Sequence, residues 1–296
     1  MIRFYFNEKE LNHHFLPLTH TRGYNSLLCG ALTIQERWML LAKKHGIELK
    51  FVENQEEADI TLSSTSIPEH DFEMGSILKD PAISIQQVIN IERPWHLIQY
   101  QAHVLKSDIS LISKQSIYAS THPSIHVSGK HSLFVHPSAK IETCFIQTED
   151  GPVLIEEGAH VMQGSMLRGP LYIGKNAVVK MGATLYAGTS IGHHCIVGGE
   201  IKNSIFYPYS NKAHHGYIGD SIIGAWCNLG AGTTCSNLKN TVGKIKVWDI
   251  HTNSFKLSTE KMGIILGDHV RTAVNTSFNS GTVVGAFANV FELKGL

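Results

Sequence analysis

Long hydrophobic runs are missing from this chain of 296 residues, since no stretch approaches the roughly 18 apolar residues of a membrane-spanning helix. We therefore expect no membrane partner. An excess of charge is missing too, because 25 Lys and Arg balance 25 Asp and Glu. A chain without a basic excess lacks the electrostatic footprint for nucleic acid or an anionic membrane surface, and neither is expected to bind.

Paired cysteines are also missing. The chain has five cysteines, an odd number, and none forms a Cys-x-x-Cys pair. We expect reduced core residues, as in cytosolic proteins. The opening MIRFYFNEKE is too short and too soon acidic for a secretion signal, which predicts a cytoplasmic protein.

What the chain does have is a period of six. From Ile173 to Val197 it reads IGKNAV, VKMGAT, LYAGTS and IGHHCI, each opening on an aliphatic residue with a small residue four places on. The pairing returns at 155–167, 223–233 and 266–290. This period fits neither a helix nor an alternating strand, and it is typical of a hexapeptide parallel β-helix.

The physical interpretation of the repeat is direct. Each unit lays one short strand along a face of a prism, with its aliphatic residue pointing inward and its small residue at a corner. Backbone groups pair with the coils above and below, so each strand needs neighbours. We expect a mainly β domain over 113–296. It is interrupted at 238–262, where KIKVWDIHTNSFKLS predicts a projecting hairpin.

The first 112 residues lack the period and predict a small α/β domain. IRFYF and IELKFV predict strands, and Thr33 is placed to cap an amphipathic helix that ends near Gly46. Residues 61–86 are polar and weakly patterned, which predicts a loop. Residues 93–112 predict a helix that ends the domain.

The most specific stretch lies between Gly199 and Asn237, where KAHHGYIGD is followed by NLGAGTTCSN. These motifs resemble K-A-G-H-x-x-Y-x-G-D and N-x-G-A-G-T-x-x-x-N of the bifunctional bacterial N-acetylglucosamine-1-phosphate uridyltransferase/glucosamine-1-phosphate acetyltransferase. The resemblance implies a left-handed coil and a homotrimer. It also implies an enzyme that transfers an acyl group from acetyl-CoA to an amino sugar, either phosphorylated or nucleotide-linked.

The resemblance also implies the site residues. An amine that attacks a thioester must lose a proton, and histidine has a suitable pKa, so the catalytic base falls on His214. Without the resemblance, the same histidine would be a solvated loop residue and the asparagines of the motifs would be coil corners. The tyrosine that usually follows the second asparagine is replaced by Leu238. The residues implied to hold or orient the sugar are Lys202, Tyr217, Asn228, Asn237 and, on weaker grounds, Lys180.

The first domain resembles the opening of sugar-nucleotide pyrophosphorylases through FLPLTHTRGYNSLLCGALTIQERW. Nearly the whole chain resembles the Bacteroidetes-type sugar nucleotidyltransferase-like proteins, whose members extend further at the first domain and the C-terminus. This resemblance implies, as an expectation only, a shortened or incomplete sequence. The glycine-rich phosphate loop is absent, because no glycine precedes Gly23. We interpret Arg22, just before it, as structural.

Two alternatives to acyl transfer stay open. One is nucleotidyl transfer in the first domain, with Mg²⁺ and a sugar 1-phosphate or nucleotide sugar. The other is a catalytically silent trimeric scaffold or sensor. The His-His pairs at 13–14, 193–194 and 214–215 invite a zinc hypothesis, but adjacent residues on a strand point oppositely, and we expect no metal site.

Overall fold

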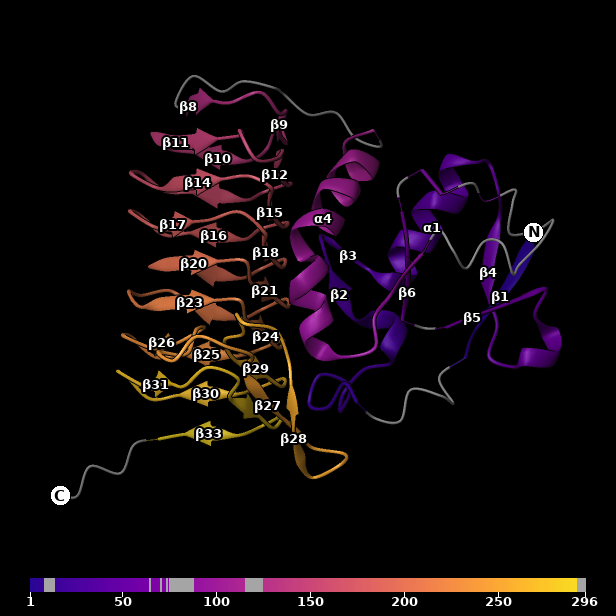
Figure 1. Ribbon diagram of the computed structural model, residues 1–296. Helices are drawn as coiled ribbons and strands as arrows, with labels where there is room; N and C mark the ends of the chain where they lie inside the picture. Colours follow the sequence, from indigo (N-terminus) through magenta and orange to yellow (C-terminus); the bar gives the residue numbers. More distant parts are fainter. Residues whose placement is uncertain are drawn as a thin grey trace.

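The computed structural model describes residues 1–7, 14–63, 65–69, 71–72, 74, 88–114 and 125–291. A stack of short strands forms a prism, and a smaller α/β domain lies beside it (Figure 1). Helix α4 (Pro94–Ser113) runs between the two, where residues 93–112 were predicted to be helical. The predicted mainly β solenoid is confirmed, and its handedness stays a prediction.

Three parallel sheets form the faces of the prism. Face 1 contains β10 (Lys140–Ile141), β13 (His160–Val161), β16 (Val178–Val179), β19 (Ile196–Val197), β22 (Asn211–Lys212), β25 (Asn228–Leu229), β30 (Arg271–Thr272) and β33 (Asn289–Val290). Face 2 contains β8 (Ile125–Ser128), β11 (Cys144–Gln147), β14 (Met166–Arg168), β17 (Thr184–Leu185), β20 (Glu200–Lys202) and β23 (Tyr217–Gly219), and is continued by the pair β26 (Thr234–Cys235) and β31 (Ser277–Phe278). Face 3 contains β9 (Leu133–Val135), β12 (Val153–Ile155), β15 (Leu171–Ile173), β18 (Thr189–Ile191), β21 (Ile205–Phe206), β24 (Ile222–Ile223), β29 (Ile265–Leu266) and β32 (Val283–Val284).

The repeat places its aliphatic residues as predicted. On face 1, Val161, Val179 and Val197 lie level on successive strands, and all three are fully buried. The small residues Ala177 and Cys195 are buried at the corners. Identical shapes thus stack at each level, which lets each strand pair with the next at a constant spacing.

The first domain is built on a three-stranded parallel sheet in the order β4 (Leu49–Phe51), β1 (Ile2–Asn7), β5 (Ile60–Ser63). Helix α1 (Ile34–Lys44) starts at Thr33 as predicted, in a capping box with Glu36, and Trp38 packs edge-on against Phe4. The loop predicted over 61–86 is wrong at its beginning, because β5 and β6 (Ser66–Pro68) are strands there. Much of the remainder lies outside the described residues. The other elements are η1 (Tyr24–Ser26), β2 (Leu28–Cys29), β3 (Leu32–Thr33), η2 (Gln55–Glu57) and β7 (Val88–Asn90).

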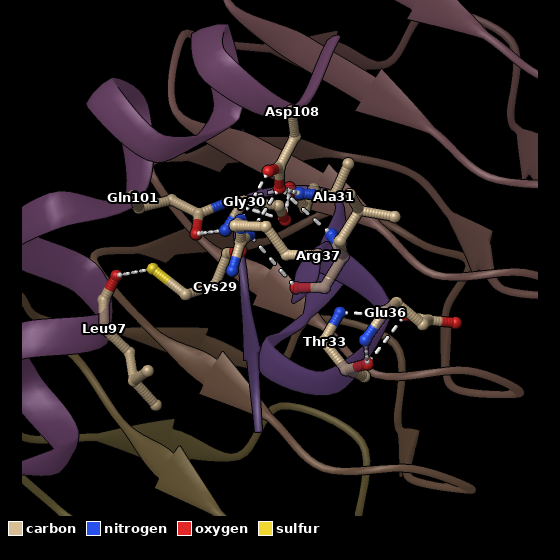
Figure 2. A network of polar contacts seen from close by, with 11 residues as sticks. Cys29, Gly30, Ala31, Thr33, Glu36, Arg37, Leu97, Gln101 and Asp108 are labelled. Carbon is tan, nitrogen blue, oxygen red and sulfur yellow. Dashed lines mark hydrogen bonds and ion pairs between the residues drawn. The ribbon is translucent and has the colours of Figure 1, made fainter. Parts of the chain in front are cut away.

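A buried polar network fastens the first domain to the prism (Figure 2). Arg37 of α1 donates to both carboxylate oxygens of Asp108 in α4, at 2.7 and 2.6 Å, and both side chains are fully buried. Gln101, about two turns before Asp108 in α4, donates to Ser190 Oγ of face 3 at 2.7 Å. Apolar residues on the outer side of face 3, such as Ile205, share one core with the first domain. The division of the chain at 112 therefore stays a prediction, since the two parts pack as neighbours of one core.

Between β26 and β29, strands β27 (Lys246–Asp249) and β28 (Ser254–Leu257) pair antiparallel as a hairpin. The hairpin lies against the first domain of its own chain. The Asp249 carboxylate is 3.4 Å from His14 Nδ1 and 3.4 Å from Arg93 Nη1. Burial lowers the pKa of His14, and Arg93 lowers it further. The insertion thus joins the two parts of the chain.

Candidate active site

The predicted base, His214, lies at the corner where the chain passes from face 1 to face 2. Residues 213–216 form this corner between β22 and β23, whereas only Gly198 and Gly199 form it in the preceding coil. The His214 side chain is exposed. A corner of four residues next to a corner of two makes a step in the prism at this point.

The two glycines fit this step closely. A Cβ on Gly198 would lie 2.5 Å from the Ala213 carbonyl oxygen. A Cβ on Gly199, whose φ is +74°, would lie 2.9 Å from the His214 carbonyl oxygen. Such distances are shorter than van der Waals contact allows, so the backbone that carries His214 rests directly on glycine. Lys180, the weaker candidate, also packs against Gly198: a Cβ on Gly198 would lie 3.3 Å from the Lys180 Cβ.

Inside the corner lies a residue that the sequence interpretation missed. Lys212 is level with Val197 on face 1, at the position of the aliphatic ladder, and is fully buried. Its Nζ donates to the carbonyl oxygens of His214 at 2.5 Å and of His215 at 2.8 Å. Burial lowers the pKa of Lys212 to about 8. The only signal in the sequence was a lysine where a hexad places Val or Leu.

At the opposite end of β23 lies a second group of polar side chains. The Asn237 amide donates to the Tyr217 phenol oxygen at 2.9 Å and to Asp220 Oδ2 at 2.5 Å. Asn203 donates to the other oxygen of Asp220 at 2.7 Å. Burial raises the pKa of Tyr217 to about 12, so the phenol is neutral at physiological pH. Within the described part of the chain no acceptor takes its hydroxyl proton, which stays available to a ligand.

The two remaining candidates belong to neighbouring strands. Lys202 ends β20 with its side chain exposed, and its backbone lies level with Gly219 of β23. Asn228 is exposed on face 1, level with Asn211 on the strand before and Arg271 on the strand after. By their place in the coils, the six predicted residues are divided here into two sets. The corner group comprises His214, Lys180, which packs against Gly198, and Asn228 on face 1. The phenol group comprises Tyr217, Asn237 and Lys202, which is level with Gly219 of β23.

Two cavities of the described structure lie away from these groups. One, of about 690 Å³, separates the first domain from the corner between faces 3 and 1, and Arg22 lines it. Arg22 forms an ion pair with Asp268 and lies 4.0 Å over the Tyr207 ring. Because these contacts join the domains, they agree with a structural role for Arg22.

The other cavity, of about 590 Å³, opens at the carboxyl ends of β1 and β5. Parallel α/β sheets commonly bind ligands at this edge. Asn7, Ser63, Asn90 and Arg93 line it, and Glu92 is the one carboxylate among its described lining residues. A search of the described residues finds no cluster of three His, Cys, Asp or Glu side chains that would hold a metal ion. All five cysteines are buried free thiols, as predicted.

Comparison with known proteins finds no matching family model. A bifunctional sugar-1-phosphate nucleotidylyltransferase/acetyltransferase of Sulfurisphaera tokodaii is 33% identical over 147 residues, which are 48% of this chain and 35% of the relative. The bifunctional protein GlmU of Methanocaldococcus jannaschii is 39% identical over 147 residues, 46% of this chain and 33% of the relative. GlmU of Methanococcus maripaludis is 32% identical over 199 residues, 67% of this chain and 41% of the relative.

A solved structure was also matched: the acetyltransferase domain of PglB from Neisseria gonorrhoeae aligns over 99% of this chain and 98% of its own, at 11% identity and a TM-score of 0.22. So low a score supports no argument. In the described residues no helix is long and apolar enough to cross a membrane. The chain spans between a third and about two fifths of the length of the relatives quoted above. In sequence, up to two thirds of this chain is thus similar to bifunctional sugar-1-phosphate nucleotidyltransferase/acetyltransferases of the GlmU type.

Proposed function

We propose that the solenoid transfers the acetyl group of acetyl-CoA to the amine of an amino sugar that carries a phosphate or a nucleotide. The observation that supports this most is the arrangement of the KAHHGYIGD motif. An exposed imidazole stands on a closely packed corner, three residues before a neutral phenol whose hydroxyl proton is unused.

The chemistry assigns a role to each group. The sugar amine attacks the thioester carbonyl, a C–N bond forms, the C–S bond breaks and CoA leaves as the thiol. His214 takes the proton that the amine loses and passes it to the departing thiolate sulfur of CoA. Tyr217 donates a hydrogen bond to the acceptor sugar, and Asn237 fixes the phenol in place. Lys202 and Lys180 hold the phosphate as point charges, with Asn228 orienting the bound sugar.

The proposal includes a homotrimer. Face 2 exposes Phe145 and Met166, at 54% and 51% of their surface, although its inner side is fully packed. A cyclic assembly would bury these side chains. Because its interface is heterologous, one surface of each subunit would contact a different surface of the next. The corner group of one subunit and the phenol group of its neighbour then converge on one substrate.

The decisive experiment is an acetyl-transfer assay of His214→Ala with acetyl-CoA and glucosamine 1-phosphate. Loss of a general base is expected to lower kcat by about 10²- to 10⁴-fold. His215→Ala is the matched control, because His215 is exposed on the same corner and its carbonyl contacts the same lysine. Equal turnover of His214→Ala and the wild type would refute the assignment of the base.

A second candidate, nucleotide binding by the first domain, is favoured by the cavity at the carboxyl ends of β1 and β5. Arg93 would face the phosphates. The described lining residues do not fit a Mg²⁺ site, which needs several oxygen ligands including carboxylates, so no step through that ion is derived. Calorimetry with UTP and dTTP, with and without Mg²⁺, tests the candidate on the full chain. Binding that Arg93→Ala weakens supports it, and no heat in any titration rejects it.

A further inference from the structure

An ammonium group lies inside the solenoid, where the repeat otherwise places aliphatic side chains. Val197 is level with Lys212 on one neighbouring strand, and Leu229 takes the same inward position on the other. Among the described residues no carboxylate forms an ion pair with Lys212. Removing an ammonium group from water without a counter-ion costs several kcal/mol, so a merely space-filling lysine here is costly.

The contacts of the ammonium group show what offsets this cost. Its two hydrogen bonds go to consecutive carbonyl oxygens, those of His214 and His215. Two adjacent carbonyls that point at one nitrogen fix the orientation of both peptide planes. The His215 carbonyl also accepts from the Gly232 backbone N–H at 3.2 Å, from the next coil. The corner backbone is thus in contact with three neighbours: Lys212 inside the prism, Gly232 of the next coil and Gly199 of the preceding coil.

We infer that Lys212 is a positioning residue, whose ammonium group fixes the backbone of residues 213–216 and thereby the direction in which the His214 imidazole faces the acceptor amine. Lys212 does not touch substrate, because its side chain is fully buried in the subunit. Proton transfer requires the base within about 2.6–3.2 Å of the amine, and a 1 Å displacement can cost about 100-fold in rate. The kinetic consequence rests on the proposed acyl transfer; the structural consequence does not.

The test is Lys212→Met, which keeps the length of the side chain, fills the core and removes the donor. Its matched control is Leu229→Met, at the same inward position one coil on. We expect Lys212→Met to lower kcat by about 10- to 100-fold with the KM for acetyl-CoA within about twofold, and Leu229→Met to change neither. A lysine needed only for folding would lower Tm and leave the kcat of the folded protein unchanged, and that result would overturn the inference.

A second readout does not depend on activity. The imidazole Cε1–H resonances of His214 and His215, assigned by His→Ala variants, should shift or broaden in Lys212→Met and stay in place in Leu229→Met. Unchanged resonances in Lys212→Met would overturn the positioning role even if the wild type were inactive. An inactive wild type with shifted resonances would reject the proposed function and keep the positioning role. Should Lys212→Met not fold, Lys212→Gln retains one neutral donor and is measured in the same two ways, with a smaller loss expected.

Discussion

The side-chain amide of Asn237 donates a hydrogen bond to the phenol oxygen of Tyr217, at 2.9 Å. The two residues are 20 positions apart, and the contact crosses from one coil of the solenoid to the next. Because the phenol oxygen already accepts this bond, its own proton is directed to whatever binds outside. Asn237 thus supports the phenol, and in the proposed reaction Tyr217 is the member of the pair that contacts the sugar.

Tyr217→Phe should therefore impair binding of the acceptor. The variant keeps the ring and loses one hydrogen bond of about 0.5–1.5 kcal/mol, so we expect the KM for the amino sugar to rise up to about tenfold. Steady-state kinetics with acceptor and donor varied in turn measure it. Tyr209→Phe, at the corner between faces 3 and 1, serves as control. An unchanged acceptor KM in Tyr217→Phe would contradict the assigned role.

Gly199→Ala should displace the backbone that carries His214 without a contact to the imidazole itself. Both Gly199 and Gly182 have positive φ, +74° and +68°, so alanine costs about 1–2 kcal/mol in backbone strain at either position. A Cβ at Gly182 meets nothing within 4 Å, whereas at Gly199 it meets the corner backbone. We expect a further loss of about 1–3 kcal/mol in unfolding free energy, and reduced kcat, for Gly199→Ala alone. Denaturant unfolding and acetyl-transfer assays of both variants check this, and identical behaviour of the pair would count against close packing beneath His214.

The buried Lys212 predicts a particular pH dependence of stability. Burial lowers its folded-state pKa from 10.5 to about 8, so between these values the unfolded chain binds a proton that the folded chain has released. Stability then rises with pH over this window. Other lysines, cysteines and tyrosines also titrate here, so the observable is the difference between the wild type and Lys212→Met. In urea titrations the free energy of unfolding of the wild type should gain on that of the variant from about pH 8 to 10. Parallel curves would indicate an unshifted lysine.

Two Arg–Asp pairs of the first domain should contribute differently to the free energy of unfolding. Asp108 is fully buried against Arg37, and Asp108→Ala leaves a buried guanidinium unpaired, a loss of about 3–5 kcal/mol. The Arg3–Asp59 pair, 2.7 Å long, lies in solvent, where water screens the attraction, so Asp59→Ala should lower stability far less than Asp108→Ala. Urea unfolding of both variants gives the comparison. Similar losses of unfolding free energy in the two variants would show that the buried Arg37–Asp108 pair does not stabilise the packing of α1 against α4.

Much of the fold was predictable because its signals are local and repeated. The hexad fixes the inward residues of each strand, since a strand alternates its side chains and every coil repeats the last. Thr33 marked the start of α1 because an N-cap side chain contacts backbone only three residues on. The loop predicted from residue 61 was wrong at its start, since β5 is stabilised by pairing with β1, more than 50 positions earlier.

The sequence by itself determined that this chain forms a solenoid of stacked coils, and it marked the motif that carries His214 and Tyr217. Tertiary structure alone decided the rest. The hexad marks Lys212 as an inward position, but only the tertiary structure shows that its ammonium group bonds to the carbonyl oxygens of His214 and His215. Nor could spacing place the first domain on face 3, because that contact joins side chains such as Gln101 and Ser190, 89 positions apart. Contacts that repeat with the period can be predicted from residues close together in the sequence. Contacts between residues far apart in the sequence form only when the coils stack, so the sequence pattern does not show them.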